Sequence, residues 1–215
     1  YIMHYFYIPD IDLKSNYLSR EDSRHCIRVL RLKKGDTIGI LDGKGFFAKA
    51  CLKNQDSENT EIEIFEKTHY APPSCSIHIA IAPPKNIDRF EWFLEKATES
   101  GISQITPLLC LRSERKKLNN ERLEKVIISA LKQSGNPFKP VLNPMTDFLE
   151  FTKNADAGSQ KFIAHFQKTN LHFKDVYSKG KKLLILIGPE GDFGEKELSL
   201  AKLSGFEMIN LSPNR

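Results

Sequence analysis

No Cys-x-x-Cys pair occurs in this sequence, whose four cysteines are scattered at Cys26, Cys51, Cys75 and Cys110. This excludes a zinc ribbon and a disulfide framework, and it predicts free thiols in a reducing cytoplasm. Metal-ligand spacing is also missing among the histidines His4, His69, His78 and His172. No metal site is therefore expected.

Long hydrophobic segments are absent as well. The longest apolar run, Leu183–Ile187, is far too short to span a bilayer. No charged-then-apolar leader opens the chain, so secretion is not expected, and Met3 is the expected native start. Of the 215 residues, 40% are apolar and 27% are charged. These proportions predict a folded chain with a substantial core and exclude a disordered or membrane-embedded one.

The charges are separated along the chain, with a net charge of +5. One basic cluster contains Arg24, Arg28, Arg31, Lys33 and Lys34, and a second contains Arg112, Arg115, Lys116 and Lys117. Acidic residues gather elsewhere, at Asp56, Glu58, Glu61, Glu63 and Glu66. This separation favours a surface that binds a polyanion such as RNA or DNA. The alternative is two solvated surface patches.

The first 70 residues have mainly the pattern of strands. Strands are predicted over 5–8, 37–41, 46–53 and 61–66, and residues 42–45 (DGKG) are a strong hairpin signal. In the last of these strands, Ile62 and Ile64 share one face. We expect a small, antiparallel, barrel-like unit.

One helix is predicted in this region, from a cap at Ser19 to residue 31. Helical spacing places Cys26, Val29 and Leu30 on one face, which is expected to pack against the core. It places Arg24, Arg28 and Arg31 on another face. Guanidinium groups suit phosphate oxygens because they donate two hydrogen bonds at once.

Residues 71–74 (APPS) are the expected linker, because strands and helices alternate after them. The predicted strands cover 77–82, 102–109, 161–165, 183–187 and 206–211, and the predicted helices cover 88–100, 120–134 and 195–204. Asp192 is the expected N-cap of the last helix. This alternation predicts a parallel sheet with right-handed crossovers.

Residues 188–194 (GPEGDFG) form a glycine-rich turn between the apolar strand 183–187 and a helix. Ligands of α/β proteins bind at such strand ends. The turn lacks the Lys-Ser/Thr of a phosphate-binding Walker loop and the spacing of a dinucleotide fingerprint, and Glu190 and Asp192 would repel a phosphate. A ligand with a cationic or neutral head fits better. An ordinary tight turn is the alternative.

Several stretches together resemble the RsmE family of 16S rRNA (uracil-N3)-methyltransferases, within the SPOUT class. They are residues 25–31 (HCIRVLR) with 34–36 (KGD), 96–101 (KATESG) with 105–107 (ITP), 112–113 (RS), 132–134 (KQS) and 187–191 (IGPEG). They occur in the family's order and cover almost the whole chain.

The resemblance implies an α/β protein with a PUA-like small β-barrel for RNA over residues 1–70. It implies a SPOUT methyltransferase domain with a parallel sheet and a C-terminal trefoil knot over residues 71–215. The family continues past the point equivalent to Arg215, so the knot would be incomplete in this chain. The resemblance also implies a homodimer. The implied binding partner is 16S rRNA or the small ribosomal subunit.

The cofactor implied by the resemblance is S-adenosylmethionine, held by three loops at strand ends. These loops contain Ala164, His165, Ile187, Gly188, Pro189, Glu190, Gly191, Leu211 and Ser212. The family usually has glycine where this chain has Ser212. The expected RNA-binding residues are Arg24, Arg28, Arg31, Lys33, Lys34, Arg112 and Arg115.

The expected reaction is methylation of N3 of a uridine in small-subunit rRNA. A uracil N3 carries a proton that must leave, so the enzyme needs a base or a positive field. No catalytic base is identified, and the candidate catalytic residues are Arg112 and Gln133. Two alternatives stay open. One is a non-catalytic RNA-binding module whose knot no longer holds cofactor, and the other is a nucleotide-binding enzyme that uses the glycine turn.

Overall fold

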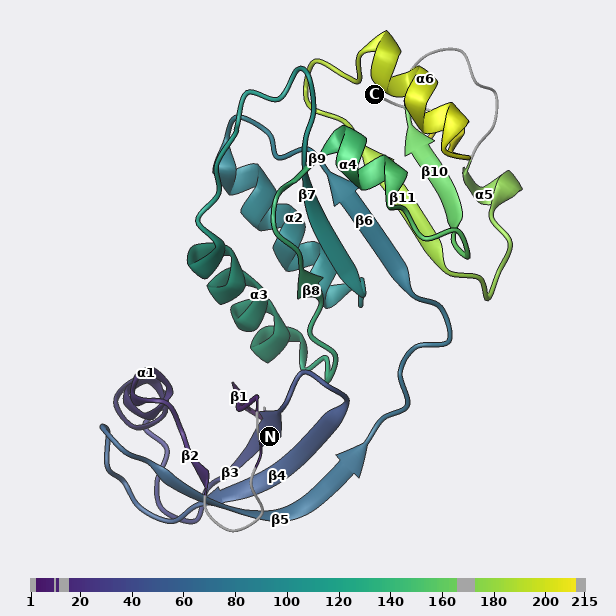
Figure 1. Ribbon diagram of the computed structural model, residues 1–215. Helices are drawn as coiled ribbons and strands as arrows, with labels where there is room; N and C mark the ends of the chain where they lie inside the picture. The colour runs from purple at the N-terminus through teal and green to yellow at the C-terminus, as the bar shows by residue number, and fades with distance from the viewer. Residues whose placement is uncertain (1–2, 10, 12–15, 166–172, 212–215) are drawn as a thin grey trace. The chain divides into compact units, whose positions relative to one another are not determined.

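The structure is a computed structural model that describes residues 3–9, 11, 16–165 and 173–211. The chain divides into two compact units (Figure 1). Unit 1 contains Tyr1–Pro72 and Ile127–Lys139, and unit 2 contains Pro73–Val126 and Pro140–Arg215. Each unit has its own sheet and its own core and is described by itself.

Unit 1 is built on a five-stranded sheet with the order β1-β3-β4-β5-β2. Its strands are β1 (Tyr5–Tyr7), β2 (Asn16–Tyr17), β3 (Thr37–Leu41), β4 (Phe46–Leu52) and β5 (Glu61–His69). β1 pairs with β3 in parallel, so the expectation of an entirely antiparallel unit was wrong at this edge, and the other pairs are antiparallel. A long connection, and not a tight turn, joins β1 to β3, and such a connection permits parallel pairing. The predicted alternation in β5 is confirmed, because Ile62 is buried and Ile64 packs against the same core.

The predicted hairpin joins β3 to β4. Asp42 Oδ1 accepts hydrogen bonds from the amides of Lys44 at 2.7 Å and Phe46 at 2.9 Å. Gly43 and Gly45 have φ angles of +73° and +109°. Side chains are disfavoured at both angles, so the aspartate and the glycines together determine this turn.

The predicted helix over 19–31 begins as expected but does not stay an α-helix. Ser19 caps α1 (Arg20–Arg24) by accepting a hydrogen bond from the amide of Asp22 at 3.1 Å. A π-helix, η1 (His25–Val29), follows, and the amide of Leu30 donates to the carbonyl of His25 at 2.9 Å.

The wider turn of the π-helix changes which side chains face the core. Cys26 is fully buried as predicted, but Val29 is 65% exposed, so the prediction that it packs was wrong. Arg31 has a φ of +56° and lies after the helix, so it does not continue the face of Arg24 and Arg28. The α-helical period of 3.6 residues does not predict which side chains share a face here, because i→i+5 hydrogen bonds replace the i→i+4 bonds of an α-helix.

Unit 2 contains a parallel sheet with the order β12-β10-β11-β6-β7-β8, and β9 also pairs with β7. The strands are β6 (Ile77–Ile81), β7 (Gln104–Leu109), β8 (Val141–Leu142), β9 (Thr146–Asp147), β10 (Gln160–Ala164), β11 (Leu183–Ile187) and β12 (Glu207–Ile209). Every pairing is parallel, as predicted. β11 is at the predicted residues and its first four residues are buried. A strand covered on both faces has such an apolar sequence.

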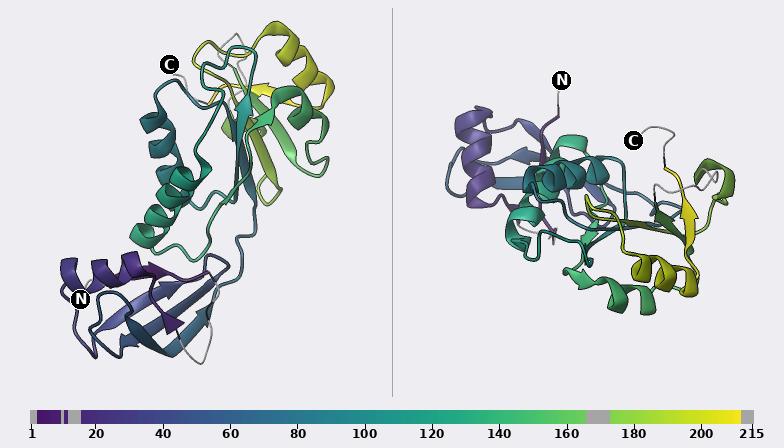
Figure 2. Two further views of the ribbon diagram at one scale, coloured as in Figure 1. Left: turned by 60° about the vertical axis from the view of Figure 1, so that its left-hand side comes forward. Right: turned by 90° about the horizontal axis from the view of Figure 1, so that it is seen from above.

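Helices cover both faces of this sheet (Figure 2). They are α2 (Ile87–Glu99), α3 (Asn120–Ser134), α4 (Phe148–Lys153), α5 (Phe173–Val176) and α6 (Glu195–Leu203). Phe148 of α4 and Ala201 of α6 pack on the face that contains Leu184 and Leu186. The residues of α3 from Ile127 onward group with unit 1. The short elements β2, β8, β9, α4 and α5 were not expected from the sequence.

His78 is a partly buried histidine on β6, and its Nε2 lies 2.8 Å from Thr106 Oγ1. Asn143 Nδ2 donates to the same hydroxyl at 2.7 Å. Burial lowers the pKa of His78 from 6.5 to about 4. Below pH 6.5, His78 binds a proton in the unfolded chain but stays neutral in the folded chain. The free energy of unfolding therefore decreases as the pH falls.

We expect the free energy of unfolding to fall by about 2–3 kcal/mol between pH 7 and pH 4.5 because of His78 alone. Urea unfolding at the two pH values measures this change. His78→Gln keeps a polar group beside Thr106 but does not titrate, so it should lose that part of the pH dependence. An identical pH dependence in the variant would contradict the assignment to His78.

Within the described part of the chain, no helix is long and apolar enough to cross a membrane. The same residues contain no group of three or more His, Cys, Asp or Glu side chains that could hold a metal ion. Burial raises the pKa of the Cys26 thiol to about 11 and that of Cys110 to about 12. Both thiols therefore stay protonated at neutral pH and are poor nucleophiles.

Candidate functional site

The three strand ends predicted to hold a ligand are neighbours in unit 2. β10 lies between β11 and β12, with Ala164 paired with both Ile187 and Ile209. The amide of His165 donates to the carbonyl of Ile209 at 3.2 Å. Because all three strands are parallel, their carboxyl ends meet at one edge of the sheet. Leu211 follows β12 and is about half exposed, and Ser212 lies outside the described residues.

The glycine turn after β11 is shaped by packing on one side. A Cβ atom added to Gly188 would lie 2.9 Å from a ring carbon of Phe193, so only glycine fits there. Phe193 is 3% exposed and packs against Phe148, with ring centroids 5.5 Å apart. The amide of Asp192 donates to the carbonyl of Pro189 at 2.9 Å, which closes the turn.

The other side of the turn presents free backbone donors. Among the described residues, the amides of Gly188, Glu190 and Gly191 donate no hydrogen bond. Glu190 and Gly191 are exposed and Gly188 is half-buried, so these amides at the strand end are accessible to a ligand.

His165 and Asp192 connect the loops after β10 and β11. His165 Nδ1 lies 2.8 Å from Asp192 Oδ2, an approach without hydrogen-bond alignment, and the His165 side chain is only 7% exposed. Asp192 Oδ1 also accepts a hydrogen bond from the amide of Phe193 at 2.8 Å. Asp192 has a φ of +61°, a conformation that few residues other than glycine, asparagine and aspartate adopt readily.

The cap of the following helix differs from the prediction. Gly194, not Asp192, is the N-cap of α6, and Glu197 Oε2 accepts a hydrogen bond from the Gly194 amide at 2.8 Å. Glu197 Oε1 accepts another from the amide of Leu111 at 2.8 Å. The buried carboxylate thus ties the start of α6 to the loop after β7. The sequence could not reveal this link, because the two segments are far apart in the chain.

The charged candidates in unit 2 contact the glycine turn or its neighbours. Arg112 Nη1 donates to the carbonyl of Gly191 at 2.7 Å, and Glu190 pairs with Arg89 at 3.3 Å on the surface. Arg115 donates to the backbone carbonyls of Pro84 and Lys85. Arg112 therefore lies at the edge of the strand-end site.

The basic candidates of unit 1 converge on one acidic residue. Arg24 Nε and Nη2 donate to the two carboxylate oxygens of Glu58 at 2.8 and 3.0 Å, and Arg20 donates to the same carboxylate. Arg28 lies 3.9 Å from it and donates to Ser57. These hydrogen bonds lower the pKa of Glu58 to about 2. The arginines beside Glu58 are therefore Arg20, Arg24 and Arg28. Arg20 was not predicted from the sequence, and Arg31 is not among them.

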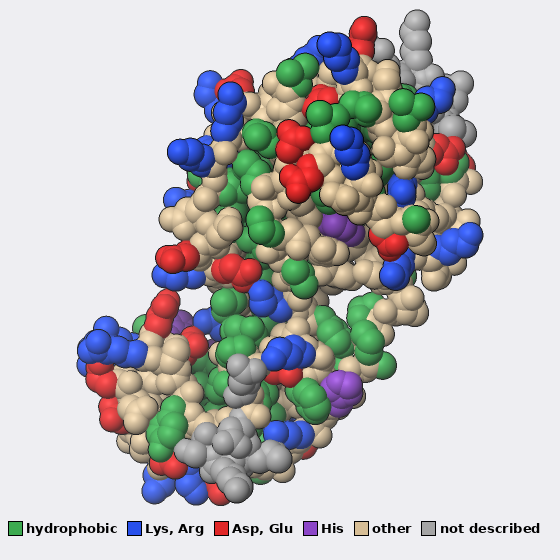
Figure 3. All heavy atoms as spheres, viewed as in Figure 1, with side chains coloured by type: hydrophobic (Ala, Val, Ile, Leu, Met, Phe, Trp, Pro, Cys, Tyr) green, Lys and Arg blue, Asp and Glu red, His purple; other side chains and the backbone are tan. Residues whose placement is uncertain are grey.

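The surface of unit 1 reflects this mixture of charges. In Figure 3, basic and acidic side chains lie next to one another on the side where Figure 1 shows α1. The side chains of Arg31, Lys33 and Lys34 are exposed beyond the π-helix. Gln133, the second catalytic candidate, is exposed near the end of α3 and belongs to unit 1, whereas Arg112 belongs to unit 2.

The chain thus combines a unit with a parallel sheet, whose neighbouring strand ends present backbone donors, and a separate small β-sheet unit. The profile of the RNA methyltransferase domain matches residues 71–215, and that of the RNA methyltransferase PUA domain matches residues 18–65. The chain therefore belongs to the RNA methyltransferase family.

Individual relatives confirm the resemblance to the RsmE type. Ribosomal RNA small subunit methyltransferase E 2 of Borreliella burgdorferi is 29% identical over 214 residues, covering 93% of this chain and 85% of the relative. A crystal structure of a probable rRNA-methyltransferase from Porphyromonas gingivalis is 34% identical and superposes with a TM-score of 0.91, covering 99% of this chain and 91% of the other.

A second solved structure carries a ligand. Ribosomal RNA small subunit methyltransferase E from Neisseria gonorrhoeae, bound to S-adenosyl methionine, is 25% identical with a TM-score of 0.88. The match covers 100% of this chain and 91% of the other.

Proposed function

We propose that this protein is an S-adenosylmethionine-dependent methyltransferase that methylates N3 of a specific uridine in 16S rRNA. The observation that carries the proposal is the cluster of strand ends at β10, β11 and β12, with free amides after β11, in a chain of the RNA methyltransferase family. The similarity to small-subunit rRNA methyltransferases over almost the whole chain supports it. A non-catalytic RNA-binding module is not favoured.

The residues at the strand ends fit the proposed cofactor. Free amides at Gly188, Glu190 and Gly191 suit the polar atoms of a nucleoside and an amino-acid group. The neighbouring carboxylates of Glu190 and Asp192 suit a positively charged ligand. Ala164, His165, Ile187, Pro189 and Leu211 complete the proposed cofactor-binding set, with Ser212 beyond the described residues.

Methyl transfer to uracil would require that the protein position the two reactants and stabilise the negative charge that develops on uracil. S-adenosylmethionine supplies an electrophilic methyl group when it is bound. The guanidinium of Arg112 has five N–H donors, of which one is used by the carbonyl of Gly191. In our proposal the others stabilise the negative charge that develops on uracil as its N3 proton leaves. Arg112 is therefore the preferred catalytic candidate.

The remaining parts of the proposal concern organisation. Residues 1–70 would be the PUA-like RNA-binding domain and residues 71–215 the methyltransferase domain, acting as a cytoplasmic homodimer. The strand order β12-β10-β11, in which the last strand returns beside β10, supports a trefoil knot at these strand ends. Trp92 and Leu111 are exposed apolar side chains on unit 2 that a dimer would be able to cover.

Methyl transfer to isolated small ribosomal subunits tests the function directly. The protein is incubated with radiolabelled S-adenosylmethionine and subunits from a strain that lacks this modification. Nuclease digestion and mass spectrometry should then find one 3-methyluridine. Methylation of another atom, or none with either subunits or free 16S rRNA, would contradict the proposal.

Asp192→Asn should weaken S-adenosylmethionine binding about five- to tenfold, equivalent to about 1 kcal/mol. Asparagine tolerates the same φ, so the turn keeps its path, but the charge beside His165 is lost. Titration calorimetry measures the affinity. Glu195→Gln, which removes an exposed carboxylate three residues away, is the control and should bind like the wild type. Equal affinities for all three proteins would show that the negative charge of Asp192 does not contribute to cofactor binding.

A further inference from the structure

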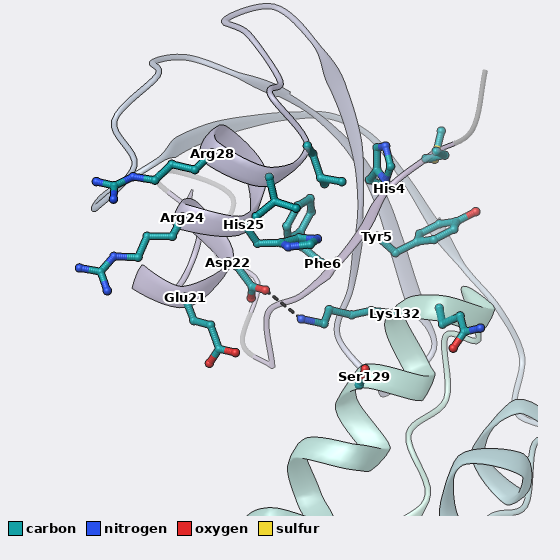
Figure 4. Close-up of a pocket in the computed structure, with 14 residues that line it drawn as sticks. His4, Tyr5, Phe6, Glu21, Asp22, Arg24, His25, Arg28, Ser129 and Lys132 are labelled. Atoms are coloured by element: carbon teal, nitrogen blue, oxygen red, sulfur yellow. Dashed lines mark hydrogen bonds and ion pairs between the residues drawn. The ribbon is translucent and has the colours of Figure 1, made fainter. Parts of the chain in front are cut away.

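Two stretches that carry the sequence resemblance lie outside the strand-end site. Residues 25–31 (HCIRVLR) form the π-helix and the turn after it, and residues 132–134 (KQS) end α3. Although far apart in sequence, both contribute to one cavity of unit 1, with a volume of about 660 Å³ (Figure 4). Strand β1 forms another part of the wall.

Charge is balanced at one point in the cavity wall. Lys132 Nζ donates to Asp22 Oδ1 at 2.9 Å, and the two side chains face one another in Figure 4. These side chains are only 28% and 12% exposed. Because each charge is satisfied by the other, the cavity does not require a strongly charged ligand.

The other lining groups combine flat rings with neutral hydrogen-bonding groups. His4 and His25 supply the rings, and Ser129 and Gln133 supply a hydroxyl and an amide. A nucleobase has the complementary properties, since it has a flat face and a polar edge. Unpaired RNA bases are typically bound in this way, by stacking on aromatic or histidine rings and by hydrogen bonds to the base edge.

The edge of the cavity carries the basic groups that a nucleotide also needs. Arg24 and Arg28 line it, and in Figure 4 their guanidinium groups extend outward from α1 and η1. The π-helix holds His25 and Arg28 on its single wide turn. Such π-helical turns occur frequently at functional sites.

We propose that this cavity binds one unpaired nucleotide of the RNA substrate. Its base stacks on the ring of His4 or His25 and is recognised by Gln133, and its phosphate lies at Arg24 and Arg28. The proposal rests on the proposed function, because it assumes that RNA is the substrate. It makes Gln133 an RNA-recognition residue rather than a catalytic one.

Two cavity variants, His25→Ala and Gln133→Ala, test the proposal by their affinity for 16S rRNA at several salt concentrations. Both side chains are exposed, so the fold should be preserved. We expect binding about tenfold weaker for each variant, because base stacking and base-edge contacts are lost. The salt dependence should not change, because no phosphate contact is removed. Asn120→Ala, which removes an amide from the start of the same helix, is the control.

Photo-crosslinking gives an independent readout. Wild-type protein is irradiated with 16S rRNA that contains 4-thiouridine, and the crosslinked peptides are identified by mass spectrometry. Crosslinks to residues 3–6, 25–30 or 129–133 are expected, with loss of signal in the His25→Ala variant.

Crosslinks confined to other segments, or cavity variants that bind RNA like the wild type, would overturn this proposal. The proposed function would survive that result if the wild type still methylates RNA. A wild type that methylates no RNA but binds it through the cavity would instead contradict the proposed function.

Discussion

Replacing Gly188 with alanine is expected to lower the affinity for S-adenosylmethionine at least tenfold and to lower the Tm by several degrees. The new Cβ would lie 2.9 Å from the ring of the buried Phe193, so either the turn or the ring must move. Overpacking of this kind costs about 1–3 kcal/mol. If the turn moves, its free amides move with it. Titration calorimetry and thermal unfolding measure the two effects.

Two further variants separate packing from the general effect of losing a glycine. Gly158→Ala adds a Cβ whose nearest neighbour is the Asp156 side chain at 3.4 Å, so it should behave like the wild type. Phe193→Leu in the Gly188→Ala background makes room for the Cβ and should restore part of the affinity. Unchanged cofactor binding in Gly188→Ala would refute the assignment of this turn.

The double variant Arg24→Ala/Arg28→Ala is expected to bind 16S rRNA about tenfold more weakly at physiological salt. Each lost phosphate contact also removes about 0.7–0.9 from the slope of log affinity against log salt, so the slope should decrease by about 1.5. Binding measured over a range of salt concentrations tests both. Lys49→Ala/Lys53→Ala is the charge-matched control, because these lysines pair with Glu66 and Glu63 on the strands of unit 1.

Glu58→Gln should have the opposite effect and strengthen RNA binding. Its carboxylate accepts hydrogen bonds from Arg20 and Arg24, and these hold its pKa near 2, so it stays charged at neutral pH. Removing this charge releases guanidinium groups for phosphates without changing any arginine. An unchanged affinity in Glu58→Gln, together with an unchanged salt slope in the arginine variant, would place RNA elsewhere on the protein.

Local patterns predicted much of the fold. The apolar strand Leu183–Ile187, the helix Asn120–Ser134 and the turn at residues 42–45 agree with the structure because apolar periodicity and turn chemistry act over a few neighbouring residues. Ser19 caps α1 as predicted for the same reason. The short elements α4 and α5 were missed, since they are too brief to show a helical period.

The failures have a different origin. Helical spacing placed Val29 in the core, but a π-helix turned it to solvent. Spacing also predicted three free arginines, although Glu58, more distant in the sequence, accepts hydrogen bonds from Arg24. Asp192 has the side chain of a good cap, yet Gly194 caps α6 while Asp192 approaches His165. The last two outcomes depend on a partner that is distant in the chain, and the first depends on a helix geometry that spacing does not reveal.

The amino-acid sequence by itself determined the kind of protein: a strand-rich first unit, a parallel sheet in the second, the glycine turn and the family. These follow from short-range pattern and from motifs in order. Only the tertiary structure decided which groups meet. It brought three strand ends together, joined Arg24 to Glu58, and placed residues 25–31 and 132–134 around one cavity. Such contacts depend on the packing of segments that are distant in sequence, and local sequence patterns do not predict them.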